Sequence, residues 1–185
     1  MIQRVAAAIL IVYSTLVIQR ALPDLPERIP TRFDLHGHPT ASSRPETLWL
    51  LLAAQALIVA LFLAVPYLAR YAPQRVNLGR KRLSDFAPDT RAQILKLIED
   101  ATGWMAVGFA LFLTILTRQL IRAAMDPRQG PTIWLILLYL VAFLAVFGYY
   151  TWKYMELEKS SASAAPLQRT KGVQPPLPRN PGFKP

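Results

Sequence analysis

Two stretches of this chain, residues 48–68 and 132–152, each run for about 20 residues without a single charged side chain. An α-helix rises about 1.5 Å per residue and the hydrocarbon core of a bilayer is about 30 Å thick, so about 20 apolar residues are enough to cross it. Gln55 is the most polar side chain in the first stretch. Both stretches are therefore predicted to be transmembrane helices.

Two further apolar stretches, 5–18 and 103–117, are shorter. Arg4 and Arg20 flank the first, and Arg118 follows the second. A long basic side chain can extend to the lipid headgroups while its methylene stem stays in the apolar layer, which lengthens the effective span. These two stretches are predicted to cross as well.

The sequence thus predicts an all-α membrane protein, a four-transmembrane-helix bundle with a short extended extracytoplasmic loop and a disordered C-terminal tail. The transmembrane domain covers 1–158. Its predicted parts are spans near 3–22, 48–68, 102–121 and 132–153, an outer loop 23–47 and a cytoplasmic loop 69–101, followed by a disordered Pro-rich tail 159–185.

The first span could also be read as a cleaved signal peptide, because Arg4 precedes a 14-residue apolar stretch. Cleavage requires small residues at a small-x-small site. The stretch ends instead on the bulky residues Ile18, Gln19 and Arg20. An uncleaved signal anchor is therefore favoured.

Composition supports a bilayer rather than a nucleic-acid partner. Hydrophobic residues make up 53% of the chain and charged residues 17%, and the formal net charge is +10. A duplex-binding protein gathers its Lys and Arg on one continuous face, whereas here they lie between the apolar stretches. The chain has no cysteine, which excludes disulfides and thiolate metal sites.

The aromatic residues point the same way, because Trp and Tyr favour the membrane–water interface. Core aromatics are the alternative interpretation. Eight such residues lie at or near the ends of the predicted spans: Trp49, Tyr67, Tyr71, Trp104, Trp134, Tyr149, Tyr150 and Trp152.

The basic residues predict the orientation. The N-terminus, the loop 69–102 and the C-terminal tail together carry fourteen Lys and Arg, whereas the connections 19–47 and 118–131 carry seven. Cytoplasmic segments beside a span are enriched in these residues. We expect a multi-pass protein of the cell inner (plasma) membrane with cytoplasmic N- and C-termini.

The outer loop is too rich in proline for a helix. From Ile29 to Asp34 its apolar and polar residues alternate with the period of a strand that has one apolar face. His36 and Gly37 resemble a turn. We expect a short extended segment or hairpin that caps the outer ends of the helices.

The cytoplasmic loop carries the basic run Arg80, Lys81 and Arg82. Anionic headgroups attract such residues by about 1 kcal/mol each near the surface, so membrane lipids are the expected partners here. Asp85 and Pro88 are helix-start signals, and Ile94, Leu95, Ile98 and Ala101 follow at helical spacing. This indicates an amphipathic helix that leads directly into the third span.

The tail from Lys159 is composed of Ser, Ala, Pro, Gln and basic residues, with little apolar content to offset the entropy of ordering. Residues 175–179 resemble a polyproline ligand, with a plain disordered tail as the alternative.

Residues 25–39 resemble the signature of the SdpI-like bacterial membrane proteins, whose N-terminal domain has no established function. In that family a first helix is followed by Leu-Pro-x-x-Ile-Pro-x-His-Phe-x-x-x-Gly-x-Pro-Asp and a second helix. Seven positions match in order and spacing: Leu25, Pro26, Ile29, Pro30, Phe33, Gly37 and Pro39. Arg32 stands where the family has His, and Thr40 where it has Asp.

The resemblance covers about residues 5–70 and implies a function. The namesake of the family protects a bacterium against a secreted toxic peptide and relays the presence of that peptide to a cytoplasmic regulator. Peptide immunity or signal sensing through the outer loop is therefore what the resemblance implies.

No catalytic residue can be nominated, because the sequence has no nucleophile elbow, zinc-protease motif or phosphate-binding glycine loop. His36 and His38 alone are too few ligands for a metal ion. Ser14, Thr15, Gln55 and Thr114 could hydrogen-bond between helices. We expect a non-enzymatic protein without cofactor or metal.

Two functions fit these observations. The first is an SdpI-like protein whose outer loop meets a peptide, a lipid or a protein partner. The second is an accessory or structural subunit of a larger membrane complex. A transporter is disfavoured, since the span interiors carry no ionisable side chain.

Overall fold

The computed structural model describes residues 1–34, 39–78, 81–126 and 133–169. Gly37, Arg80 and residues 170–185 of the tail lie outside these ranges. In chain order the elements are α1 (Ile2–Ala21), η1 (Leu22–Asp24), β1 (Ile29–Phe33), β2 (Pro39–Ser43), α2 (Thr47–Tyr71), η2 (Pro73–Arg75), β3 (Asn77–Leu78), β4 (Lys81–Arg82), η3 (Leu83–Asp85), α3 (Pro88–Met125) and α4 (Ile133–Arg169).

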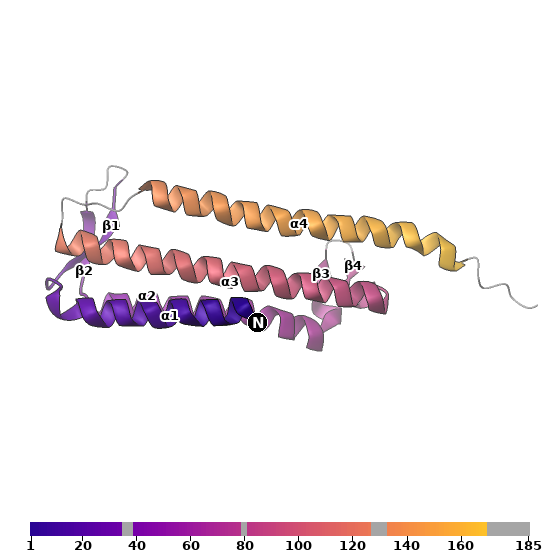
Figure 1. Ribbon diagram of the computed structural model, residues 1–185, viewed down its shortest axis with the longest axis horizontal. Coiled ribbons are helices and arrows are strands. Elements are labelled where there is room, and N and C mark those ends of the chain that lie inside the picture. Colours follow the sequence, from indigo (N-terminus) through magenta and orange to yellow (C-terminus); the bar gives the residue numbers. More distant parts are fainter. Residues whose placement is uncertain (35–38, 79–80, 127–132, 170–185) are drawn as a thin grey trace, which may run out of the picture.

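Four of these helices are long and apolar enough to cross a bilayer, as the sequence predicted. They begin within a few residues of the expected spans, except that α3 includes the predicted amphipathic helix and starts at Pro88. Proline suits the first helical turn, where its missing N–H has no partner in any case. Figure 1 shows α1 and α3 ending, and α2 beginning, beside β1 and β2; we call this the hairpin end.

Helix α3 is the centre of the bundle, because α1, α2 and α4 all pack against it. Ala106, Ala110 and Thr114 repeat every four residues on α3 and are buried. Small side chains at this spacing let helix axes approach closely. Ala7 of α1 and Val59 of α2 are buried in the same cluster as Ala106 and Ala110.

A buried polar network joins three helices at mid-height. Thr114 Oγ1 donates to Ala110 O at 2.7 Å, so its lone pairs are left to accept from Gln55 Nε2 at 3.2 Å and from Ser14 Oγ at 2.8 Å. Gln55 Nε2 also donates to Ala110 O at 3.0 Å. Ser14, Gln55 and Thr114 thus bond between helices as predicted. Thr15 does not, because its hydroxyl donates to Ile11 O of its own helix.

An ionic network joins the same three helices at the opposite end. Glu99 of α3 accepts from Arg4 of α1 at 2.8 Å and from Arg70 of α2 at 2.6 Å, one guanidinium at each carboxylate oxygen. Arg4 also donates to Tyr67 Oη at 2.9 Å. Arg4, Arg70 and Glu99 thus lie beside one another. Each of them is close to the end of the apolar stretch of its own helix.

The hairpin end is capped as the sequence predicted. β1 and β2 pair antiparallel, with Ile29 opposite Ser43 and Phe33 opposite Pro39. Ile29 is fully buried in a cluster with Ile18, Leu48 and Ile121. The hairpin is therefore anchored in the bundle by one apolar side chain.

The opposite end contains a small hairpin, β3 and β4, that the sequence did not predict. Here Asp85 is not a cap of α3, since its carboxylate accepts from the backbone N–H of Arg82 at 2.9 Å and closes the η3 turn. The segment between α2 and α3 packs against Ala69 of α2. It does so through the buried side chains of Leu83 and Phe86, together with Ile94 of α3.

One predicted boundary was wrong. Helix α4 continues to Arg169, ten residues past Lys159, where the tail was expected to begin. Hydropathy reports where a helix leaves an apolar environment, and a polar segment rich in Ala can continue the helix beyond that point.

Replacing Ile29 by Ala should lower the free energy of unfolding by about 2–4 kcal/mol, because a fully buried side chain leaves a cavity between hairpin and helices. The measurement is reversible unfolding in mixed micelles. Ile9→Ala is the matched control, since Ile9 is 61% exposed. Equal losses in the two variants would contradict the anchoring role.

Replacing Thr114 by Val should cost about 0.6–2 kcal/mol in the same measurement, because Ser14 and Gln55 lose a shared acceptor. Thr151→Val is the control, because Thr151 is exposed and its hydroxyl donates to Phe147 O of its own helix. A loss no larger than that of the control would rule out an interhelical contribution.

Candidate functional site

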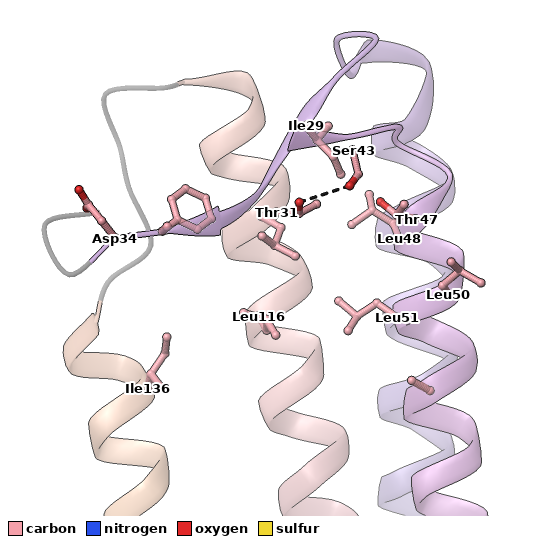
Figure 2. A pocket seen from close by; sticks show the side chains of 13 residues that line it. Ile29, Thr31, Asp34, Ser43, Thr47, Leu48, Leu50, Leu51, Leu116 and Ile136 are labelled. Carbon is pink, nitrogen blue, oxygen red and sulfur yellow. Dashed lines mark hydrogen bonds between the residues drawn. The ribbon is translucent and has the colours of Figure 1, made fainter. Parts of the chain in front are cut away.

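A groove of about 1010 Å³ lies beneath β1 at the hairpin end. Figure 2 shows α2 on one side, α3 at the back and α4 on the other side, with the strand crossing above. Leu51 of α2, Leu116 of α3 and Ile136 of α4 represent the three walls. Strand β1 forms the roof, where Phe33 is partly exposed to the groove and Ile29 is buried in the core cluster beside it.

Nine of the thirteen lining residues are apolar, and the four others gather at the hairpin. Thr31 and Ser43 share a hydrogen bond of 3.3 Å, which Figure 2 marks, and Thr47 Oγ1 donates to Arg44 O at 2.7 Å. Asp34 lies beyond them, toward α4 (Figure 2). The groove therefore has an apolar body and one polar end.

Aromatic side chains hold the helices together below the groove. The ring of Phe109 on α3 lies 5.6 Å from that of Phe62 on α2 and 5.5 Å from that of Phe143 on α4. These residues are about two helical turns from Leu116 and Ile136, or about 10 Å along the axes. The aromatic contact thus closes the inner end of the groove, while α2 and α4 stay apart above it.

The resemblance segment contributes unequally to this site. Ile29 and Phe33 line the groove, whereas Leu25 packs on the core cluster beneath the hairpin. Pro26 and Pro30 face a separate crevice of about 420 Å³ beside Ala123 and Ala124. Pro39 pairs with Phe33 in the hairpin, and Gly37 lies outside the described residues.

The groove walls were missed by sequence reasoning. Leu51, Leu116 and Ile136 come from three different spans, and in each span they are apolar residues among apolar residues. Hydropathy has the same value for a leucine that faces lipid and for one that faces a groove. The alternation in β1 was the one signal at hand, and it identified the roof.

The basic run predicted to meet headgroups lies at the opposite end. Lys81 and Arg82 form β4, Arg82 is exposed, and Arg80 lies outside the described residues. Contact with lipid stays a prediction. Among the residues that the structure describes, no group of three metal-ligating side chains is found, and His36 and His38 are outside that range.

Comparison of the chain with protein-family models, with curated proteins and with solved structures finds no match. The SdpI-like resemblance therefore depends on the seven matching positions in residues 25–39. The function that it implies is a proposal.

Proposed function

We propose that this protein is a non-enzymatic, multi-pass protein of the plasma membrane that binds an amphipathic peptide in the groove beneath the hairpin. The role would be peptide immunity or sensing, as the SdpI-like resemblance implies. The observation that supports it is an apolar groove of about 1010 Å³ roofed by β1, whose partly exposed Phe33 belongs to the resemblance segment.

The shape and chemistry of the groove suit a peptide. Its volume is at the upper end of the range for small-molecule pockets, which leaves room for several apolar side chains. The hairpin above it has two strands, so within the described chain each strand keeps one unpaired edge. An extended peptide can add to such an edge through main-chain hydrogen bonds while its side chains enter the groove.

The proposed orientation brings the groove within reach of a secreted peptide. The hairpin end carries the connections with seven basic residues, and the opposite end carries the segments with fourteen. On the positive-inside rule the hairpin end is the extracytoplasmic one. A peptide that enters the outer leaflet would then meet the groove from the side.

Single introduced cysteines test this orientation. The chain has no cysteine of its own, so no other residue of the protein can be labelled through a thiol. Glu27 before β1 and Asp89 at the start of α3 are both exposed. A membrane-impermeant maleimide applied to intact cells should label Glu27→Cys and leave Asp89→Cys unlabelled until the cells are permeabilised. The reverse pattern would invert the topology and remove the outer groove.

Filling the groove should weaken binding. Leu51→Trp places a larger side chain in one wall, and Leu57→Trp is the control, since Leu57 is 62% exposed on the same helix. Bacteria expressing the chain are challenged with a panel of apolar toxic peptides, and the concentration that halves growth is measured. For a peptide against which the protein protects, Leu51→Trp should reduce that concentration about ten-fold, a loss of about 1.4 kcal/mol of binding.

The control variant should protect as the unmodified protein does. Two results would refute the proposal. One is full protection by Leu51→Trp, and the other is a panel in which no peptide distinguishes cells with the protein from cells without it.

An accessory subunit of a membrane complex is the second candidate, and the exposure of α4 is consistent with it. In the most apolar part of α4, no residue is buried inside the bundle. Its large side chains are well exposed, among them Trp134, Leu138 and Val141. Such a surface suits either lipid or a neighbouring subunit. Purification in mild detergent distinguishes them, since a subunit would migrate with its complex at fixed stoichiometry.

A further inference from the structure

Three arginines gather at the hairpin end, on the face between α1 and α3. Arg20 of α1 and Arg118 and Arg122 of α3 line a crevice of about 320 Å³. Helices α1 and α3 run in the same direction, so their last turns lie at the same level (Figure 1). The groove beneath the hairpin has a different lining, with none of these residues in it.

These guanidinium groups have no carboxylate partner in the part of the chain that the structure describes. Asp24 lines the same crevice but forms no ion pair with any of them within 4.0 Å. Arg118 lies over the ring of Tyr13 at 6.0 Å instead. At the other end of the same helices, by contrast, Arg4 and Arg70 both pair with Glu99.

The positive charge of the three arginines exceeds the negative charge that lines the crevice. Arg20 and Arg122 are in the last turns of their helices, where the backbone dipole is favourable but equals only about half a charge per helix. Three guanidinium charges against Asp24 leave an excess of two. All three arginines are exposed, so this excess positive charge is open to an anion from the surroundings.

The crevice also has an apolar floor. Ile121 and Ala21 are buried, and Val17 packs on the core cluster beneath them. Tyr13 lies about 10 Å below Arg20, two turns closer to the centre of α1. A ligand held here would have its anionic group among the arginines and apolar atoms below, which is the arrangement of a phospholipid.

We propose that the crevice of Arg20, Arg118 and Arg122 binds a phosphate group. The planar fork of a guanidinium matches two phosphate oxygens, so three arginines can hold one phosphate by several charge-assisted hydrogen bonds. The phosphate could belong to an anionic phospholipid or be free in solution, and the apolar floor favours the lipid. The site is independent of the peptide groove and of the orientation of the chain in the membrane.

Native mass spectrometry of the full-length protein in detergent tests this site. Dioleoylphosphatidylglycerol, dioleoylphosphatidylcholine and inorganic phosphate are titrated separately. The phosphatidylglycerol should bind the unmodified protein at least about ten-fold more tightly than the phosphatidylcholine. Arg118→Gln with Arg122→Gln should weaken that binding by about ten-fold or more, because two charged donors are lost.

Arg28→Gln with Arg44→Gln is the matched control, since it removes the same charge from exposed positions at the same end but outside the crevice. It should leave binding within about two-fold of the unmodified value. Arg20→Gln on α1 is a second, milder variant. It decides the outcome if the double variant does not elute as a single species.

Each result bears on the proposal. Arginine-dependent binding of phosphatidylglycerol supports the lipid as the source, and arginine-dependent binding of inorganic phosphate supports the soluble ion. Binding that survives both Arg20→Gln and the α3 double variant would overturn the site. Equal loss in the control would also overturn it, because the effect would then follow net charge and not the crevice.

Discussion

The close approach of three helices at α3 is the constraint on which the other features depend. Helices surrounded by hydrocarbon gain little from burying apolar surface against one another, so they associate through tight packing and hydrogen bonds. Ala106 and Ala110 supply the packing, and Thr114 supplies the hydrogen bonds to α1 and α2. Close contact is even clearer at Gly103, where an added Cβ would lie 3.1 Å from the Gln3 side chain.

Helix α4 is held differently, and the groove follows from that difference. Its contacts with α3 are aromatic, with Phe143 at the edge of Phe109 and Tyr139 stacked on Phe112 at 4.4 Å. Large rings hold helix axes farther apart than alanines do. One central helix thus has a tightly packed face toward α1 and α2 and a looser face toward α4, and the space at the hairpin end lies on the looser side.

Much of the fold could be predicted from the sequence, because charged residues mark where apolar helices must stop and alternation marks β1. The second strand, Pro39–Ser43, gave no such signal, since Thr40, Ser42 and Ser43 have no apolar alternation. The groove was not predictable either, because its walls come from three distant segments. The salt bridges of Glu99 were not predictable either, because its two arginine partners are 29 and 95 residues away along the chain.

Helix α3 connects the groove to the opposite end of the molecule without a break. Leu120 lines the groove, and Ile94 of the same helix is buried among the residues of the β3–β4 connection, about 39 Å away along the axis. A continuous helix acts as a stiff lever. A tilt of about 5° at the groove would shift the far end by about 3 Å, enough to change the packing around Phe86. If a peptide occupies the groove as proposed, such a tilt would carry the change mechanically to the opposite end of the bundle.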